Sequence, residues 1–215
     1  MIKLERLDEP AILRERGSEW TTAFVAEREA KPGLRPASKR YAHREVKESL
    51  RAMSHGKCFY CETRLGEHEE TVDHYVGVAD DPTRAFVWAN LYLCCNGCQQ
   101  KLTSIPLSST LDPCAADEDP AAHLVFDDEV IRPRSESPRG RATIQRYKLD
   151  RPDLDLRRRQ QLGRVHKLVI ALYKRHGLAW PEAERERIRS YAAPEAAYSL
   201  MFCGALASLL PEESA

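Results

Sequence analysis

Apolar residues recur at helical spacing over the first part of the chain. Gly17 is expected to end a first short helix, and Ser18 is expected to cap a second one. Trp20 and Phe24 lie on one side of that second helix and are core candidates rather than binding residues. After a Pro- and Gly-rich loop, a third helix is expected within residues 38–56, capped by Ser38 and with Tyr41 among its apolar positions.

The apolar runs become shorter in the middle of the chain. Residues 71–76 and 91–93 are predicted strands, and residues 95–102 are predicted to begin a helix, which gives the order ββα. Two later runs, 124–126 and 130–131, are separated by acidic residues and predict a small hairpin.

Helical spacing returns after residue 141. Asp153 is expected to cap a long helix that ends at Gly177. Near its start stands the run Arg157-Arg-Arg159. Such a run is typical of a solvated face, and a nucleic-acid contact is the alternative. The pattern of helices around short strands predicts an α+β protein.

Composition narrows the class of protein. Of the 215 residues, 42% are hydrophobic and 31% are charged, as in globular proteins. No apolar stretch is long enough to span a membrane, and the first residues lack the apolar run of a secretory signal. We therefore expect a cytoplasmic protein with no membrane association, in which the seven cysteines are metal ligands or free thiols.

The charges are unevenly distributed although the net charge is zero. Residues 61–130 contain 14 Asp and Glu residues but 3 Lys and Arg residues, whereas residues 132–189 contain 17 Lys and Arg and 7 Asp and Glu. Two solvated faces of opposite sign would explain this. Alternatively, the C-terminal part or a partner supplies phosphate contacts that the acidic part cannot make.

Four cysteines form two C-x-x-C pairs, Cys58 with Cys61 and Cys95 with Cys98. Each pair can bind Zn²⁺ through two thiolates, and two pairs complete a tetrahedral site. Because that shell leaves no open position, the zinc would be structural. Redox pairs or chance spacing are the alternatives. Cys94 could replace Cys95 in a wider pair, although we favour Cys95.

The insert between the two pairs contains Asp73-His74 and Asn90. A histidine has an ordinary pKa near ~6.5, which suits it to accept a proton from water. The Asp73 carboxylate offers a hard oxygen ligand to a divalent cation. Taken alone, His74 would be read as a structural histidine, but the flanking cysteine pairs favour a catalytic role.

These motifs resemble those of the HNH endonucleases, which have a ββα-metal core. The resemblance rests on the order of Cys58-x-x-Cys61, Val72-Asp73-His74-Tyr75, Trp88-x-Asn90-Leu and Cys95-x-x-Cys98. Four further short motifs are similar to motifs in the HNH proteins of Septu-type and retron-associated anti-phage systems. They are Tyr60-Cys61-Glu62, Leu111-Asp112-Pro113, Ala142-Thr-Ile144 and Leu149-Asp-Arg151.

The resemblance implies a role for each matching residue. His74 matches the general base, Asp73 the preceding metal ligand, and Asn90 the residue that braces the loop orienting the base. The four cysteines match the structural zinc ligands. Gln99 stands where the family often has His or Asn, and its amide oxygen is a weaker ligand for a cation such as Mg²⁺.

Asp112 and His68 are further candidates for the site. The implied organisation has four segments: an N-terminal helical segment (1–57), an HNH ββα-metal zinc core (58–111), a loop with a small hairpin (112–140) and a C-terminal helical segment (141–215).

The resemblance implies a metal-dependent endonuclease that hydrolyses phosphodiester bonds, with DNA favoured over RNA. Proteins of this branch work beside an ATPase encoded nearby, so an ATPase partner is expected too. Two alternatives remain open at the level of sequence. One is a ribonuclease, and the other is a non-catalytic zinc-binding interaction module with a degraded HNH site.

Overall fold

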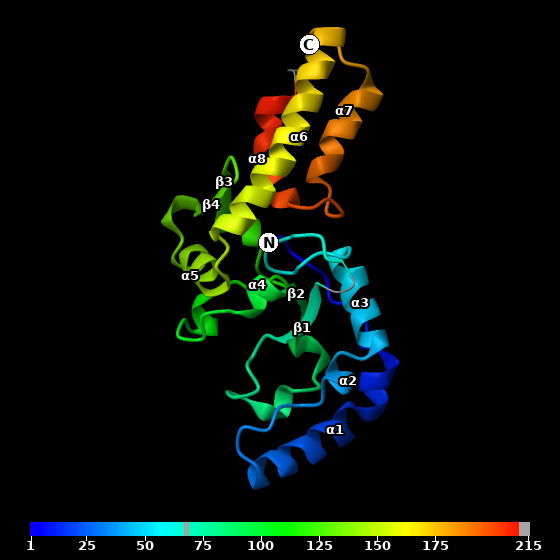
Figure 1. Cartoon of the computed structure of the whole chain (residues 1–215), viewed down its shortest axis with the longest axis vertical. Coiled ribbons are helices and arrows are strands. Elements are labelled where there is room, and N and C mark those ends of the chain that lie inside the picture. The colour runs from blue at the N-terminus through cyan, green and yellow to red at the C-terminus, as the bar shows by residue number, and fades with distance from the viewer. Residues whose placement is uncertain (67–68, 211–215) are drawn as a thin grey trace. The chain divides into compact units, whose positions relative to one another are not determined.

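The computed structural model describes residues 1–66 and 69–210 (Figure 1). Over these residues the protein is α+β, as the sequence predicts, with two separate two-stranded antiparallel sheets. The α-helices are α1 (Ala11–Ala30), α2 (Ser38–Tyr41), α3 (Arg44–Ser54), α4 (Asn96–Gln99), α5 (Pro138–Tyr147), α6 (Pro152–His176), α7 (Glu182–Arg189) and α8 (Ser199–Leu209). The strands are β1 (Glu70–His74), β2 (Leu91–Cys95), β3 (Leu124–Asp127) and β4 (Val130–Pro133).

Contacts within the chain divide it into two compact units. The β1–β2 unit comprises residues 4–59 and 64–100 and contains α1 to α4 with the first sheet. The α6 unit comprises residues 1–3, 60–63 and 101–215 and contains the second sheet with α5 to α8.

Helix α1 is continuous, so the prediction that Gly17 ends one helix and Ser18 caps another is wrong. Gly17 is buried inside this helix, and a Cβ there would lie a tight 3.3 Å from the Phe86 carbonyl oxygen. The same loop brings the Phe86 ring against Trp20 and Phe24 at 5.8 and 6.0 Å between ring centroids. Both aromatic residues of α1 are buried, which confirms that they belong to the core.

The expected third helix is two helices, α2 and α3. The chain breaks at His43, whose Nδ1 accepts a hydrogen bond from the Glu45 amide at 3.4 Å and caps α3. Ser38 is the first residue of α2 and Ala37 is its N-cap, so the expectation that Ser38 caps the helix is wrong. At the far end, His55 and Gly56 take positive φ values of 53° and 69°, so the helix ends close to where the sequence predicts.

Strands β1 and β2 pair in register from Glu70 opposite Cys95 to His74 opposite Leu91. Helix α3 packs on β2, and Val72, Leu91 and Leu93 are buried. The short α4 follows β2 at once, so the predicted ββα order is present. This ladder places Asp73 and His74 near the end of the sheet remote from Cys95.

The predicted hairpin is formed by β3 and β4, with Leu124 opposite Pro133. The long helix is α6, and it ends at Gly177 as predicted. Its N-cap is Arg151 and its first residue is Pro152, so the expectation that Asp153 caps it is wrong by two positions. Helix α7 contacts α6 (Figure 1). None of the helices in the described ranges has the length and apolarity needed to cross a bilayer.

Candidate functional site

Cys58, Cys61, Cys95 and Cys98 bring their sulfur atoms within 4.8 Å of one another. A tetrahedral zinc site with Zn–S bonds of ~2.3 Å separates its sulfur atoms by about 3.8 Å, so the cluster fits Zn²⁺ in donor type and spacing. Three of the four cysteines are buried, and Cys95 is half-buried. A closed shell of four thiolates indicates a structural site.

The structure brings Cys95 into the cluster and leaves Cys94 out. Neighbouring strand residues point to opposite faces, so β2 cannot offer both sulfurs to one ion. Cys94 is fully buried instead, with its sulfur 3.2 Å from the Thr71 hydroxyl on the paired strand.

Backbone hydrogen bonds fix the first cysteine pair beside the sheet. The Phe59 amide donates to the Leu93 carbonyl of β2 at 2.9 Å. The Leu65 amide donates to the Gly56 carbonyl at 2.9 Å and closes the loop that carries the pair. The Phe59 ring also meets the Tyr92 ring edge-on, at 5.4 Å between centroids.

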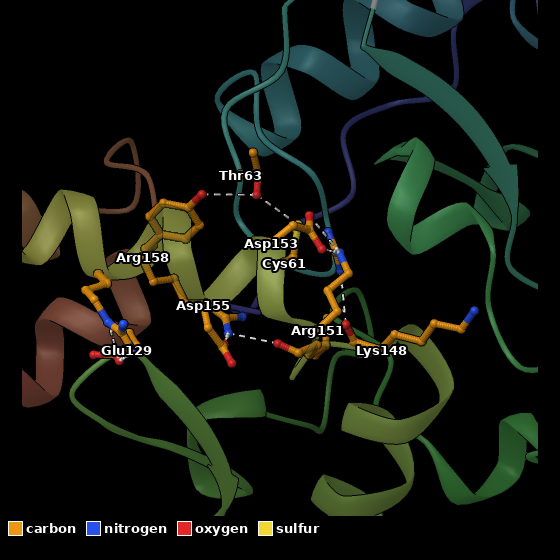
Figure 2. Close-up of polar contacts among 11 residues, drawn as sticks. Cys61, Thr63, Glu129, Lys148, Arg151, Asp153, Asp155 and Arg158 are labelled. Atoms are coloured by element: carbon orange, nitrogen blue, oxygen red, sulfur yellow. Dashed lines mark hydrogen bonds and ion pairs between the residues drawn. The ribbon is translucent and has the colours of Figure 1, made fainter.

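Within the α6 unit, Cys61 is linked by hydrogen bonds to the start of α8. Its sulfur lies 3.2 Å from the Thr63 hydroxyl, which is 3.3 Å from the Tyr198 hydroxyl. Burial raises the pKa of Tyr198, and the hydrogen bond with Thr63 opposes that rise. Figure 2 shows Cys61 and Thr63 in this chain of contacts. The next residue, Glu62, accepts a hydrogen bond from Ser199 at 2.6 Å and so holds the same helix.

Arg158 is the buried member of the Arg157–Arg159 run, with 1% of its surface exposed. It donates to the Leu149 carbonyl at 2.8 Å and to Asp155 at 3.0 Å, and its guanidinium lies over the Phe126 ring. Burial lowers the pKa of Arg158, and the charges of Cys61 and Asp155 oppose that shift. Figure 2 shows Arg158 and Asp155. The interpretation of the run as a solvated face is therefore wrong at its central residue.

His74 is the last residue of β1 and is half-buried. Its Nε2 lies 2.9 Å from the Ala85 carbonyl oxygen. A carbonyl oxygen can only accept a hydrogen bond, so a neutral His74 carries its proton on Nε2 and its lone pair on Nδ1. The loop between the strands thereby selects the tautomer and the orientation of the imidazole.

Asn90 joins the two ends of the loop between β1 and β2. Its Oδ1 accepts from the Val76 amide at 2.7 Å. Its Nδ2 donates to the Val76 carbonyl at 3.1 Å and to the Arg84 carbonyl at 3.0 Å. The side chain is fully buried, so these bonds are shielded from water. Because Arg84 directly precedes Ala85, Asn90 also fixes the carbonyl that meets His74.

Asp73 precedes His74 on β1 and is buried, and both residues interact with Tyr41 of α2. The Tyr41 ring meets the imidazole edge-on, with 4.7 Å between centroids. Burial raises the pKa of the Tyr41 hydroxyl, Arg35 opposes this, and the Asp73 charge adds to it. Sequence reasoning missed Tyr41 because its apolar spacing indicated only a core position on a longer helix.

The other candidates lie on other elements of the chain. Gln99 is exposed at the end of α4. Asp112 lies in the α6 unit, where its carboxylate accepts from the Cys114 amide at 2.8 Å in a local turn. His68 falls outside the described residues. Within the described ranges, the four cysteines are the only assembled group of three or more Cys, His, Asp or Glu ligands. A catalytic cation therefore stays a prediction.

A comparison with models of known protein families found no match, and a comparison with curated proteins found none either. The resemblance to HNH endonucleases thus rests on this chain's own residues. The four-cysteine cluster is the part of that resemblance that the structure assembles.

Proposed function

We propose that the protein is an HNH-type endonuclease in which His74 is the general base. The observation that carries the proposal is the hydrogen bond between His74 Nε2 and the Ala85 carbonyl. It orients the imidazole and makes Nδ1 the basic nitrogen, which is what proton abstraction from water requires. Asp73 precedes His74 and is buried, and because His74 is the last residue of β1, the two side chains can serve one site where the strand ends.

Three residues have separate proposed roles in hydrolysis. His74 Nδ1 takes a proton from the water that attacks the phosphodiester. Asn90 keeps the loop closed, so that the Ala85 carbonyl holds the ring through that transfer. The Tyr41 ring packs edge-on against the imidazole and limits its rotation.

Asp73 would hold a divalent cation, with Mg²⁺ expected. Mg²⁺ often takes one or two carboxylates, several waters and oxygens of the substrate phosphate, so a full protein cage is not required. Such a cation stabilises negative charge that develops on the phosphate and on the leaving oxygen. Gln99 supplies no charge, and its exposed position makes it a secondary candidate.

DNA is the favoured substrate on the resemblance, and an ATPase encoded nearby is the proposed partner in anti-phage defence. The charge distribution indicates that basic groups outside residues 61–130 are needed to hold a nucleic acid, since this segment carries 14 acidic and 3 basic side chains. A polyanion approaching that segment meets repulsion unless basic residues elsewhere hold it.

The test is nicking of supercoiled plasmid by the purified protein, alone and with its neighbouring gene product. We expect nicking with added Mg²⁺ and no nicking when a chelator is added for minutes to remove free divalent cations. Zinc content is measured in parallel to show that the structural zinc has not been removed. Side-by-side digestion of duplex DNA and tRNA separates a deoxyribonuclease from a ribonuclease. Cleavage of neither in any combination would favour the non-catalytic zinc module.

A further inference from the structure

Helix α6 carries exposed basic side chains along most of its length. Residues 156–181 contain seven Lys and Arg residues and no Asp or Glu. Six of the seven are exposed, Arg158 being the buried one. Arg159 pairs with Glu129 of the β3–β4 turn. The other five define the α6 basic face: Arg157, Arg164, Lys167, Lys174 and Arg175.

These five side chains are aligned along the helix. At about 100° per residue they fall within an arc of roughly 100°, and they extend over about 27 Å of helix axis. Among the described residues, no carboxylate lies within ion-pair distance of any of them. Their charge therefore reaches solvent without local compensation.

Neighbouring acidic residues are paired elsewhere. On α7, which contacts α6, Glu184 pairs with Arg187, and Glu182 and Glu186 pair with Arg189. At the start of α6, Asp153 pairs with Arg151 at 3.2 Å.

We propose that the α6 basic face holds the phosphate backbone of a nucleic acid, which deepens and rests on the nuclease function proposed above. Duplex DNA carries about one negative charge per 1.7 Å of its axis, so a row of cations along about 27 Å meets many phosphates. The acidic segment around Asp73 cannot supply this attraction, and α6 can.

The surface fits a polyanion better than an apolar partner. The large exposed apolar residues on or next to α6 are Leu156, Ile170 and Leu178, which are separated by two or more helical turns. They form no continuous stripe for a protein groove. The apolar side of α6, including Leu162, Val165 and Val169, is already buried, so the helix has no face left to insert into a membrane.

Two triple variants with the same change in net charge test the proposal. The first is Arg164→Gln, Lys167→Gln and Lys174→Gln, which removes three cations of the α6 basic face and keeps helix propensity. The control is Arg16→Gln, Arg44→Gln and Arg132→Gln, at exposed arginines paired with Glu19, Glu48 and Asp127. Circular dichroism and zinc content show whether each variant is folded.

Binding is measured by fluorescence anisotropy with labelled duplex DNA, single-stranded DNA and RNA of equal length, without Mg²⁺. We expect the α6 variant to lose at least tenfold in affinity and the slope of log K against log salt to fall by roughly 2 to 3. The control should change affinity by less than about threefold, since its arginines already have partners.

Equal losses in the two variants would overturn the proposal, because affinity would then follow net charge alone. Unchanged binding by the α6 variant, or no binding by the unaltered protein, would overturn it too. If the α6 variant binds normally and plasmid nicking persists, the docking surface is wrong and the nuclease stands. If the α6 variant loses binding but the unaltered protein does not nick plasmid, the docking surface stands and the nuclease function is wrong.

Discussion

The imidazole Nε2 of His74 lies 2.9 Å from the carbonyl oxygen of Ala85, eleven residues further along the chain. This contact ties the end of β1 to the loop that precedes β2. The loop is in turn closed by Asn90 through Val76 and Arg84. The orientation of the proposed base therefore depends on the buried Asn90 amide, which acts through Val76 and Arg84.

Replacing Asn90 with alanine should loosen that loop. Asn90→Ala removes three buried hydrogen bonds and leaves backbone groups of Val76 and Arg84 without those partners. We expect a loss of about 3 kcal/mol in the free energy of unfolding, measured in urea. Asn96→Ala, at the exposed first residue of α4, should stay within about 0.5 kcal/mol. Equal effects would contradict the bracing role.

Zinc content distinguishes the two adjacent cysteines of β2. Cys95→Ser should lose most of the bound zinc, because the cluster needs its sulfur. Cys94→Ser should retain about one zinc per chain, because that sulfur contacts Thr71 instead. Elemental analysis of the two purified variants decides. Loss of zinc in Cys94→Ser but not in Cys95→Ser would mean that Cys94 is the ligand.

The arginine run of α6 should show unequal effects on stability. Arg158→Met removes the bonds to Leu149 and Asp155 and leaves a half-buried carboxylate without its partner. We expect a loss of about 2 kcal/mol or more in unfolding free energy. Arg157→Met, at the exposed neighbour, should change it by less than about 0.5 kcal/mol. Similar unfolding curves would show that burial of Arg158 contributes little.

Much of the metal cluster and its strands could be predicted from sequence. Two C-x-x-C pairs predict a shared site, because each pair supplies two of the four thiolates that one tetrahedral zinc ion needs. The alternation of apolar residues in short runs located β1, β2 and the β3–β4 hairpin. These features depend on residues close together in sequence or on ligand chemistry that is independent of the fold.

Features that depend on distant contacts could not be predicted. Gly17 looks like a helix terminator, yet it lies inside α1, where the Phe86 backbone packs closely against it. Arg158 looks solvated, yet Leu149 and Phe126 enclose it. Tyr41 looks like a core residue, yet its ring meets His74. Each of these requires knowledge of which segment packs against which.

Plasmid cleavage by His74 variants tests the central claim most directly. His74→Ala removes the proposed base, and His74→Gln keeps an amide that can donate toward Ala85 but cannot accept the proton. With Mg²⁺ present, we predict at least a ~100-fold loss of nicking rate in both variants, with zinc content unchanged. Full nicking activity in either variant would contradict the assignment of His74 as the general base.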